Sequence, residues 1–131
     1  VGEDNIFIFG LTAEGVASLK QRDYNAWDYY QSNPDLKQVL DMISSGYFSQ
    51  DEPSLFQPIV DTLTHSNDYF MLLADYADYV LCQRSVDELY RQQEEWTRRA
   101  ILNVANMGKF SSDRTIQEYA DEIWEVKPVK P

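Results

Sequence analysis

The run Ile6–Phe9 constrains the fold most, because it is an unbroken apolar stretch (IFIF) with no alternating polar residues. A strand of this kind is typical of a parallel sheet that is covered on both faces. Only Tyr69–Leu73 (YFMLL) offers a second candidate strand, and the rest of the chain is mostly helical in pattern. The sequence therefore predicts a mainly α fold with one or two short strands, at about residues 6–9 and possibly 69–73. A lone strand that is buried on both faces also indicates that the chain belongs to a larger α/β domain.

The helices are predicted from apolar spacing and from residues that favour helix ends. Thr12 is expected to cap the first helix, and Asn33 precedes a proline at the first helical position, which is a common start. The leucine–valine–isoleucine spacing after Pro34 forms one apolar stripe. The predicted helices are residues 12–21, 34–44, a short helix from Ser54 carrying Leu55, Ile59 and Leu63, a longer one from Asp75 to Tyr90, then 93–106 and 113–124.

The charge of the chain excludes some partners. The 131 residues carry a net charge of −11, of which residues 1–69 contribute −8. An acidic surface disfavours nucleic acid and anionic membranes, because both require clustered cations. The single cysteine, Cys82, allows no disulfide within the chain, and no signal peptide or membrane-length apolar run is visible. The sequence therefore predicts a soluble, cytoplasmic protein.

Candidate catalytic groups are few. His65 is the only histidine, which excludes a site built from several histidines, and it lies in a turn-like stretch. Cys82 is expected in mid-helix as a buried or half-buried thiol, away from a cation that would activate it. The glycines do not form a phosphate-binding loop. Lys109 is the one lysine beside a structured turn, but its Gly and Ser neighbours predict exposure, whereas an imine-forming lysine needs desolvation.

Two sets of carboxylates share helix faces. Asp75 and Asp78 are three residues apart, and Asp75 is expected to favour the N-terminus of its helix rather than to form an acid–base pair. Glu94 and Glu95 precede Arg98 and Arg99 by four residues, so two exposed ion pairs are predicted. Both sets therefore predict helix stabilisation rather than chemistry.

The segment SSDR, residues 111–114, poses the main functional question, because a helix N-terminus can bind anions. Ser111, Ser112 and Asp113 are all good capping residues, and Asp113 would compete with a bound anion. Thr115 and Glu118 could instead form a capping box that starts the helix later. Arg114 could reach an acidic side chain or a carbonyl. The residues favour a helix cap over an anion site.

Five stretches follow one another along essentially the whole chain: GEDNIFIFGLT at 2–12, YN…YY at 24–30, SSGYFS at 44–49, LLADYADYVLCQRSVDELY at 72–90, and EWTRRAILNVANMGKFSSDRTIQEYADEIW at 95–124. Together they make the chain resemble the C-terminal end of the glycogen (α-1,4-glucan) phosphorylases. Members of that family are large, usually dimeric cytosolic enzymes with two Rossmann-like lobes of the GT-B type. They use phosphate to release glucose 1-phosphate from glucan ends, with pyridoxal phosphate held on a lysine.

The resemblance implies that residues 1–131 are a single unit, the C-terminal part of the second lobe, with a terminal helix at about 113–124 that returns toward the first. The cofactor lysine and the groups that meet sugar and phosphate lie upstream in the family. No catalytic, cofactor-binding or metal-binding residue is therefore expected here, and the chain alone is expected to be inactive scaffold without a cofactor.

The implied partners are the remainder of the phosphorylase chain and, for the full-length enzyme only, an α-glucan, phosphate and a second subunit. Nucleic acid and membranes are not expected partners. The isolated chain is expected to expose an apolar patch near Ile6–Phe9 and to self-associate through it. The alternative is a free-standing helical interaction module of phosphorylase ancestry, which would have little reason to keep that apolar run.

Overall fold

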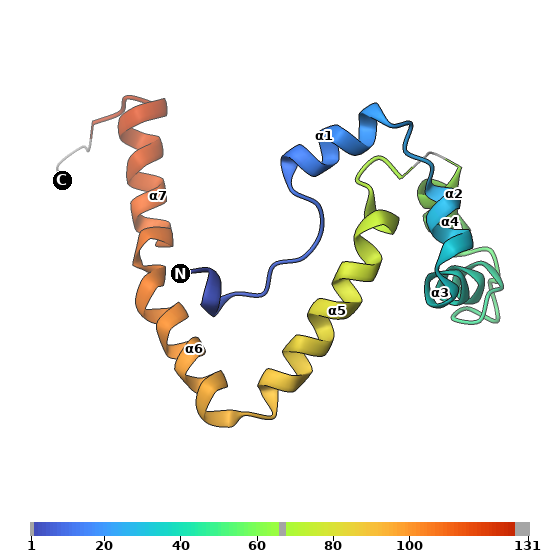
Figure 1. Cartoon of the computed structure of the whole chain (residues 1–131). Helices are drawn as coiled ribbons and strands as arrows, with labels where there is room; N and C mark the ends of the chain where they lie inside the picture. Colours follow the sequence, from blue (N-terminus) through green and yellow to red (C-terminus); the bar gives the residue numbers. More distant parts are fainter. Residues whose placement is uncertain (1, 66–67, 128–131) are drawn as a thin grey trace. The chain divides into compact units, whose positions relative to one another are not determined.

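The computed structural model describes residues 2–65 and 68–127 (Figure 1). Those residues are mainly helical, and none of them lies in a β-strand. They cluster into two compact units: unit 1 takes its residues from Val1–Phe7 and Val86–Pro131, and unit 2 is Ile8–Ser85. The long helix α5 (Leu72–Tyr90) contributes to both, because the boundary falls after Ser85.

Unit 2 holds most of the core. It contains α1 (Ala13–Gln21), α2 (Ala26–Ser32), α3 (Pro34–Ser44), α4 (Gln57–Thr64) and the first part of α5. Helices α2, α3 and α4 pack against one another. One hydrophobic cluster joins these helices to the start of α5, and its buried members are Tyr24, Ala26, Leu36, Leu40, Met71 and Leu73.

Local capping explains where the helices of unit 2 begin, and it confirms two predicted starts. The Thr12 hydroxyl accepts a hydrogen bond from the Gly15 amide at 3.1 Å, and α1 ends at Gln21 as predicted. The Asn33 side chain accepts from two amides in the first turn of α3, and Pro34 fills the first helical position. These contacts satisfy amides that lack partners within the helix.

Unit 1 contains a 3-10 turn (Glu3–Asn5), the end of α5, α6 (Gln93–Asn106), a second 3-10 turn (Met107–Phe110), α7 (Ser112–Glu118) and a π-helical turn (Tyr119–Ile123). The predicted helix 93–106 is confirmed, and the predicted helix 113–124 becomes α7 followed by the π turn. Neither α6 nor α7 contains a buried residue. Among the described residues of unit 1, Leu89 is the one buried hydrophobic side chain.

The predicted strand at residues 6–9 is wrong for this structure. Ile6 has extended backbone angles, φ −135° and ψ 149°, but no described strand lies beside it to form a ladder. Ile6, Ile8 and Phe9 are instead exposed, at 49%, 71% and 45%. The exposed apolar residues expected near Ile6–Phe9 are therefore present.

The predicted strand at 69–73 is also wrong, because this stretch is a turn that leads into a helix. Met71 has a left-handed φ of 58°, and α5 begins at Leu72, three residues before the predicted start at Asp75. Likewise α4 begins at Gln57 rather than Ser54. Its buried side chains are Val60 and Thr64, whereas the predicted Leu55 and Ile59 are each 51% exposed.

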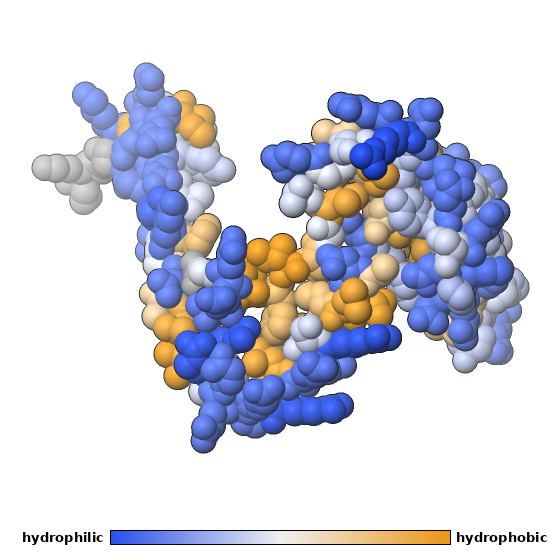
Figure 2. Space-filling view, in the orientation of Figure 1, coloured by the Kyte–Doolittle hydropathy of each residue, from blue (hydrophilic) through white to orange (hydrophobic). Residues whose placement is uncertain are grey.

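Figure 2 shows hydrophobic residues reaching the surface at several places among hydrophilic ones. The exposed large apolar side chains of α6 and the segment after it include Ile101, Val104, Phe110 and Ile116. None of the helices within residues 2–65 and 68–127 combines the length and the apolar character needed to span a bilayer.

Candidate functional site

Two carboxylates of α5 hold the backbone just after the apolar run. Asp78 Oδ2 accepts from the Gly10 amide at 2.6 Å, and Asp75 Oδ1 accepts from the Leu11 amide at 2.8 Å. Gly10 has a φ of +88°, and a Cβ there would lie 2.8 Å from the Asp75 carboxylate, so glycine fits the close approach. The two side chains thus share a helix face as predicted, but they position a distant segment rather than form an acid–base pair.

A buried carboxylate ties the turn before α5 to the core of unit 2. Asp68 is 2% exposed; its Oδ2 accepts from the Tyr24 hydroxyl at 2.9 Å and from the Leu73 amide at 2.6 Å. Burial, followed by the hydrogen bond to Asp68, raises the pKa of Tyr24, so its hydroxyl stays protonated and donates. Sequence reasoning missed Asp68, since its tyrosine partner is 44 residues away.

The surface of unit 2 carries a closed polar triangle that sequence reasoning also missed. Lys37 Nζ donates to Asp41 Oδ2 and to the Tyr30 hydroxyl, both at 2.7 Å, and that hydroxyl donates to Asp41 Oδ1 at 2.6 Å. The hydrogen bonds from Lys37 and Tyr30 lower the pKa of Asp41, and the same contacts raise the pKa of Lys37. The ion pair therefore stays charged across the physiological range.

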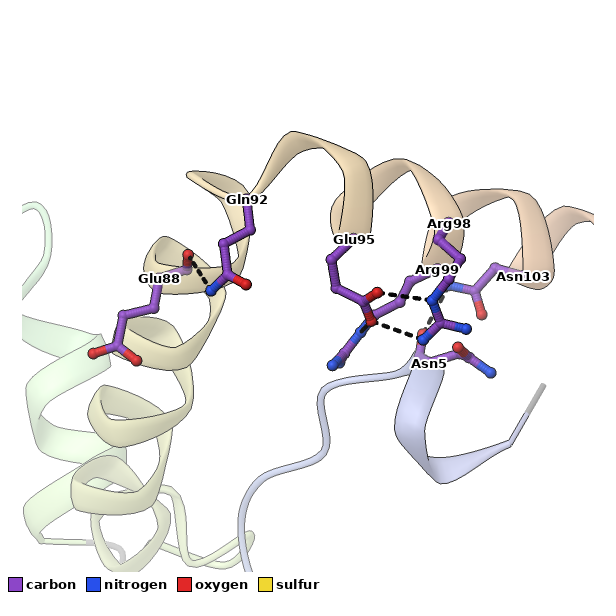
Figure 3. Close-up of polar contacts among 7 residues, drawn as sticks. All are labelled: Asn5, Glu88, Gln92, Glu95, Arg98, Arg99 and Asn103. Atoms are coloured by element: carbon purple, nitrogen blue, oxygen red, sulfur yellow. Dashed lines mark hydrogen bonds and ion pairs between the residues drawn. The ribbon is translucent and has the colours of Figure 1, made fainter.

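Figure 3 shows the polar contacts of unit 1, where Glu95 and both arginines of α6 meet. Glu95 accepts from Arg98 through both carboxylate oxygens at 2.7 Å and from Arg99 at 2.9 Å. Two separate pairs had been predicted, with Glu94 partnering Arg98; instead one carboxylate takes both guanidinium groups. Nearby, Asn103 Nδ2 donates to the Asn5 carbonyl at 2.8 Å and holds the N-terminal turn on α6.

Glu95→Gln is expected to remove an acid-dependent part of the stability of unit 1. The hydrogen bonds from Arg98 and Arg99 lower the pKa of Glu95 from 4.5 to about 2. A lowered folded pKa gives stability that is present above the unfolded value and is lost as the pH falls toward 2. Urea unfolding of both proteins between pH 7 and pH 2 measures this effect. The difference between wild type and Glu95→Gln should shrink with acid, while Glu94→Gln should show a smaller change; a constant difference would contradict the ion-pair origin.

The SSDR segment is a helix cap. The Ser111 hydroxyl accepts from the Arg114 amide at 3.3 Å, and α7 starts at Ser112, so the later capping box is not formed. Arg114 reaches both predicted kinds of partner, because its guanidinium donates to the Lys109 carbonyl and to the Glu118 carboxylate. Asp113 lies exposed in the first turn. The arginine therefore ties the turn before α7 to its last residue.

The remaining candidates do not gather into a site. His65 ends α4 as an exposed turn residue, with its ring edge-on to Trp27 at 5.8 Å. Cys82 is half-buried within α5, as expected for a thiol in mid-helix. In the described part of the chain, no three His, Cys, Asp or Glu residues cluster in a way that could hold a metal ion.

The described lysines do not fit an imine-forming role with pyridoxal phosphate. Lys20, Lys37, Lys109 and Lys127 are all exposed, whereas such a lysine is activated by desolvation. The pKa of Lys37 is moreover raised, which opposes the neutral amine that attacks a carbonyl. Lys130 lies outside the described residues.

Comparison with known proteins places the chain. The family described as carbohydrate phosphorylase matches residues 1–126. The chain belongs to this family. Glycogen phosphorylase, muscle form, from Homo sapiens is 54% identical to the phosphorylase chain over 127 residues, and the brain form from the same organism is also 54% identical over 127 residues. Glycogen phosphorylase from Synechocystis sp. is 51% identical over 129 residues. The alignments cover 97–98% of this chain but 15% of each relative, so the chain spans about a seventh of their length.

Proposed function

We propose that the chain is the C-terminal segment of an α-1,4-glucan (glycogen) phosphorylase, and that the full-length enzyme uses phosphate to release glucose 1-phosphate from glucan ends. The observation that carries this proposal is sequence identity of 54% and 51%, over 97–98% of the chain, to the glycogen phosphorylases of Homo sapiens and Synechocystis sp.. The full-length enzyme would be a cytoplasmic, dimeric, two-lobed glycosyltransferase with pyridoxal phosphate.

The segment contributes scaffold rather than chemistry in this proposal. Its well-defined polar contacts hold backbone in place: Asp75 and Asp78 fix residues 10–11, Asp68 fixes the start of α5, and Arg114 fixes the turn into α7. The exposure of the described lysines supports placing the cofactor lysine elsewhere in the longer protein. Residues 1–131 would then form one unit at the end of the second lobe, completed by the rest of the enzyme.

The exposed residues of the apolar run favour this proposal over a free-standing interaction module. Ile6 and Ile8 are exposed large apolar side chains at the position where a buried strand was predicted. Burial of such side chains stabilises a protein by roughly 1.5–3 kcal/mol each. A missing sheet of the full-length enzyme would account for their presence.

The purified chain is expected to show no phosphorolysis of glycogen and no absorbance from added pyridoxal phosphate after dialysis. The full-length protein, expressed from the complete reading frame, is expected to bind the cofactor and release glucose 1-phosphate. Both are measured by a coupled assay for glucose 1-phosphate and by the cofactor's absorbance. Activity of the chain alone would overturn its scaffold role, and an inactive full-length protein with bound cofactor would overturn the assigned reaction.

A further inference from the structure

A hollow at the connection between α1 and α2 is not used by the proposed scaffold role (Figure 1). It has a volume of about 310 Å³, and its charged lining residues are Arg22, Asp23 and Asp28. We propose that this hollow binds a free α-amino acid with an apolar side chain. The inference goes beyond the proposed function and does not depend on the assigned reaction.

The hollow brings one cation and two carboxylates together without pairing them. Arg22 forms no ion pair with any carboxylate of the described residues, although Asp23 and Asp28 line the same hollow. Asp28 Oδ1 accepts from Asn25 Nδ2 at 3.0 Å, which leaves the second oxygen for a ligand. A guanidinium binds a carboxylate through two parallel hydrogen bonds, and a carboxylate binds an ammonium in the same charge-assisted way. The separated charges therefore match the carboxylate and the ammonium of a zwitterion.

Apolar side chains line the rest of the hollow. They are Leu19 at the end of α1 and the rings of Tyr24 and Tyr29, whose centres are 5.4 Å apart. The Tyr24 ring is fixed, because this residue is 9% exposed and its hydroxyl donates to Asp68 at 2.9 Å. A wall that is ordered before the ligand arrives lowers the entropy cost of binding. The wall therefore favours an amino acid whose side chain is apolar.

The backbone of residues 22–25 is held between two helix ends. The Arg22 amide donates to the Leu19 carbonyl at 3.1 Å, and the Asn25 side chain caps α2 by accepting from the Trp27 amide at 3.2 Å. Between them Asp23 has a left-handed φ of 56°, a conformation that is uncommon outside glycine but is tolerated by aspartate and asparagine. The charged side chains of the hollow therefore project from a backbone of defined conformation.

Size and charge favour a small zwitterion over other ligands. The volume of about 310 Å³ lies at the lower end of the roughly 300–1,000 Å³ usual for small-molecule sites, which suits a single amino acid. Unit 2 carries four Lys/Arg and eleven Asp/Glu, a net charge of −7, which repels a purely anionic ligand. A purely cationic ligand would gain Asp23 and Asp28 but would be repelled by Arg22. A zwitterion interacts favourably with all three groups.

Titration of the isotope-labelled 131-residue chain with L-leucine, followed by backbone NMR, tests the site. We expect concentration-dependent shifts at residues 19–32, and an affinity about tenfold weaker in Arg22→Gln and in Asp23→Asn. Asparagine also tolerates the left-handed φ, so Asp23→Asn should keep the backbone conformation. Arg84→Gln and Asp51→Asn, at exposed positions of unit 2 outside the hollow, are the matched controls and should bind L-leucine as the wild type does. The spectrum of the buried core reports that each variant is folded.

Two analogues of leucine separate the roles of the charges. Isocaproate lacks the ammonium and isoamylamine lacks the carboxylate, and each is expected to bind about tenfold more weakly than L-leucine. The proposal is rejected by any of three results: no shifts at residues 19–32, unchanged affinity in both Arg22→Gln and Asp23→Asn, or an analogue that binds as tightly as L-leucine. Because the titration needs no catalysis, it is independent of the phosphorolysis assay. Binding of L-leucine together with an inactive full-length enzyme would uphold the amino-acid site and reject the proposed reaction.

Discussion

Asp68→Ala is expected to lower the free energy of unfolding of unit 2 by about 3 kcal/mol, because it leaves two buried donors without an acceptor. The Leu73 amide and the Tyr24 hydroxyl both donate to Asp68 Oδ2, and all three residues are at most 9% exposed. An unsatisfied buried donor costs roughly 1–3 kcal/mol. The substitution therefore destabilises the hydrophobic cluster of unit 2 directly, because Tyr24 and Leu73 belong to that cluster.

Urea unfolding monitored by tryptophan fluorescence measures the effect, and hydrogen exchange at the Leu73 amide localises it. Asp68→Asn keeps one acceptor oxygen and should lose less stability than Asp68→Ala. Asp51→Ala, at an exposed carboxylate, should change the stability by less than about 0.5 kcal/mol. Unchanged exchange at Leu73 in Asp68→Ala would show that the carboxylate does not anchor the start of α5.

Contacts that are local in sequence could be predicted from the residues. The caps at Thr12, Asn33 and Ser111 each join a side chain to an amide two or three residues later. Such contacts depend only on residue type and on the helix that follows. For the same reason the alternatives for SSDR could be stated from the sequence, and the structure then selected the Ser111 cap over the capping box at Thr115.

Contacts between distant residues could not be predicted in this way. Asp75 was assigned to its own helix, but it accepts from Leu11, 64 residues away. No sequence pattern predicted the role of Asp68, because that role depends on Tyr24, which only folding brings close to it. The bounds of α4 and α5 were misplaced for a related reason: burial of Val60, Thr64 and Leu73 decides them, and burial depends on tertiary packing.

The two strand predictions were wrong for different reasons. Residues 69–73 combine apolar composition with a left-handed Met71, which a strand does not accommodate. Residues 6–9 do begin in extended conformation at Ile6, but within residues 2–65 and 68–127 no strand lies beside them. The pattern of Ile6–Phe9 therefore indicates a context that the chain alone does not provide, in keeping with a chain that spans 15% of its relatives.

The same argument applies to the end of the chain, where the apolar side chains of the terminal helix, which the resemblance implies returns toward the first lobe, lie exposed. Ile116, Tyr119, Ile123 and Trp124 are 57%, 44%, 63% and 58% exposed, and only Ala120 is half-buried. The Trp124 ring contacts Tyr119, the first residue of the π-helical turn that Trp124 follows, at a centroid distance of 5.8 Å. These exposed side chains bury little apolar surface within the chain. We expect the rest of the full-length enzyme to cover them.

Trp124→Ala is therefore expected to destabilise the full-length enzyme much more than the isolated chain. In the full-length enzyme, burial of Trp124 against the remainder of the chain would make the substitution cost about 3–5 kcal/mol, the range for a buried tryptophan. In the isolated chain the cost should stay below about 1 kcal/mol, because the Trp124 side chain is 58% exposed and its ring contact among the described residues is with Tyr119. Chemical denaturation of both proteins measures the difference, with Glu122→Ala, at an exposed position of the π-helical turn, as the control.

The cofactor absorbance of the full-length enzyme should remain in Trp124→Ala, since these apolar side chains dock the segment and do not hold the cofactor. Equal small losses in both proteins would reject docking, whereas loss of the cofactor with unchanged stability would place a functional site at this end of the chain.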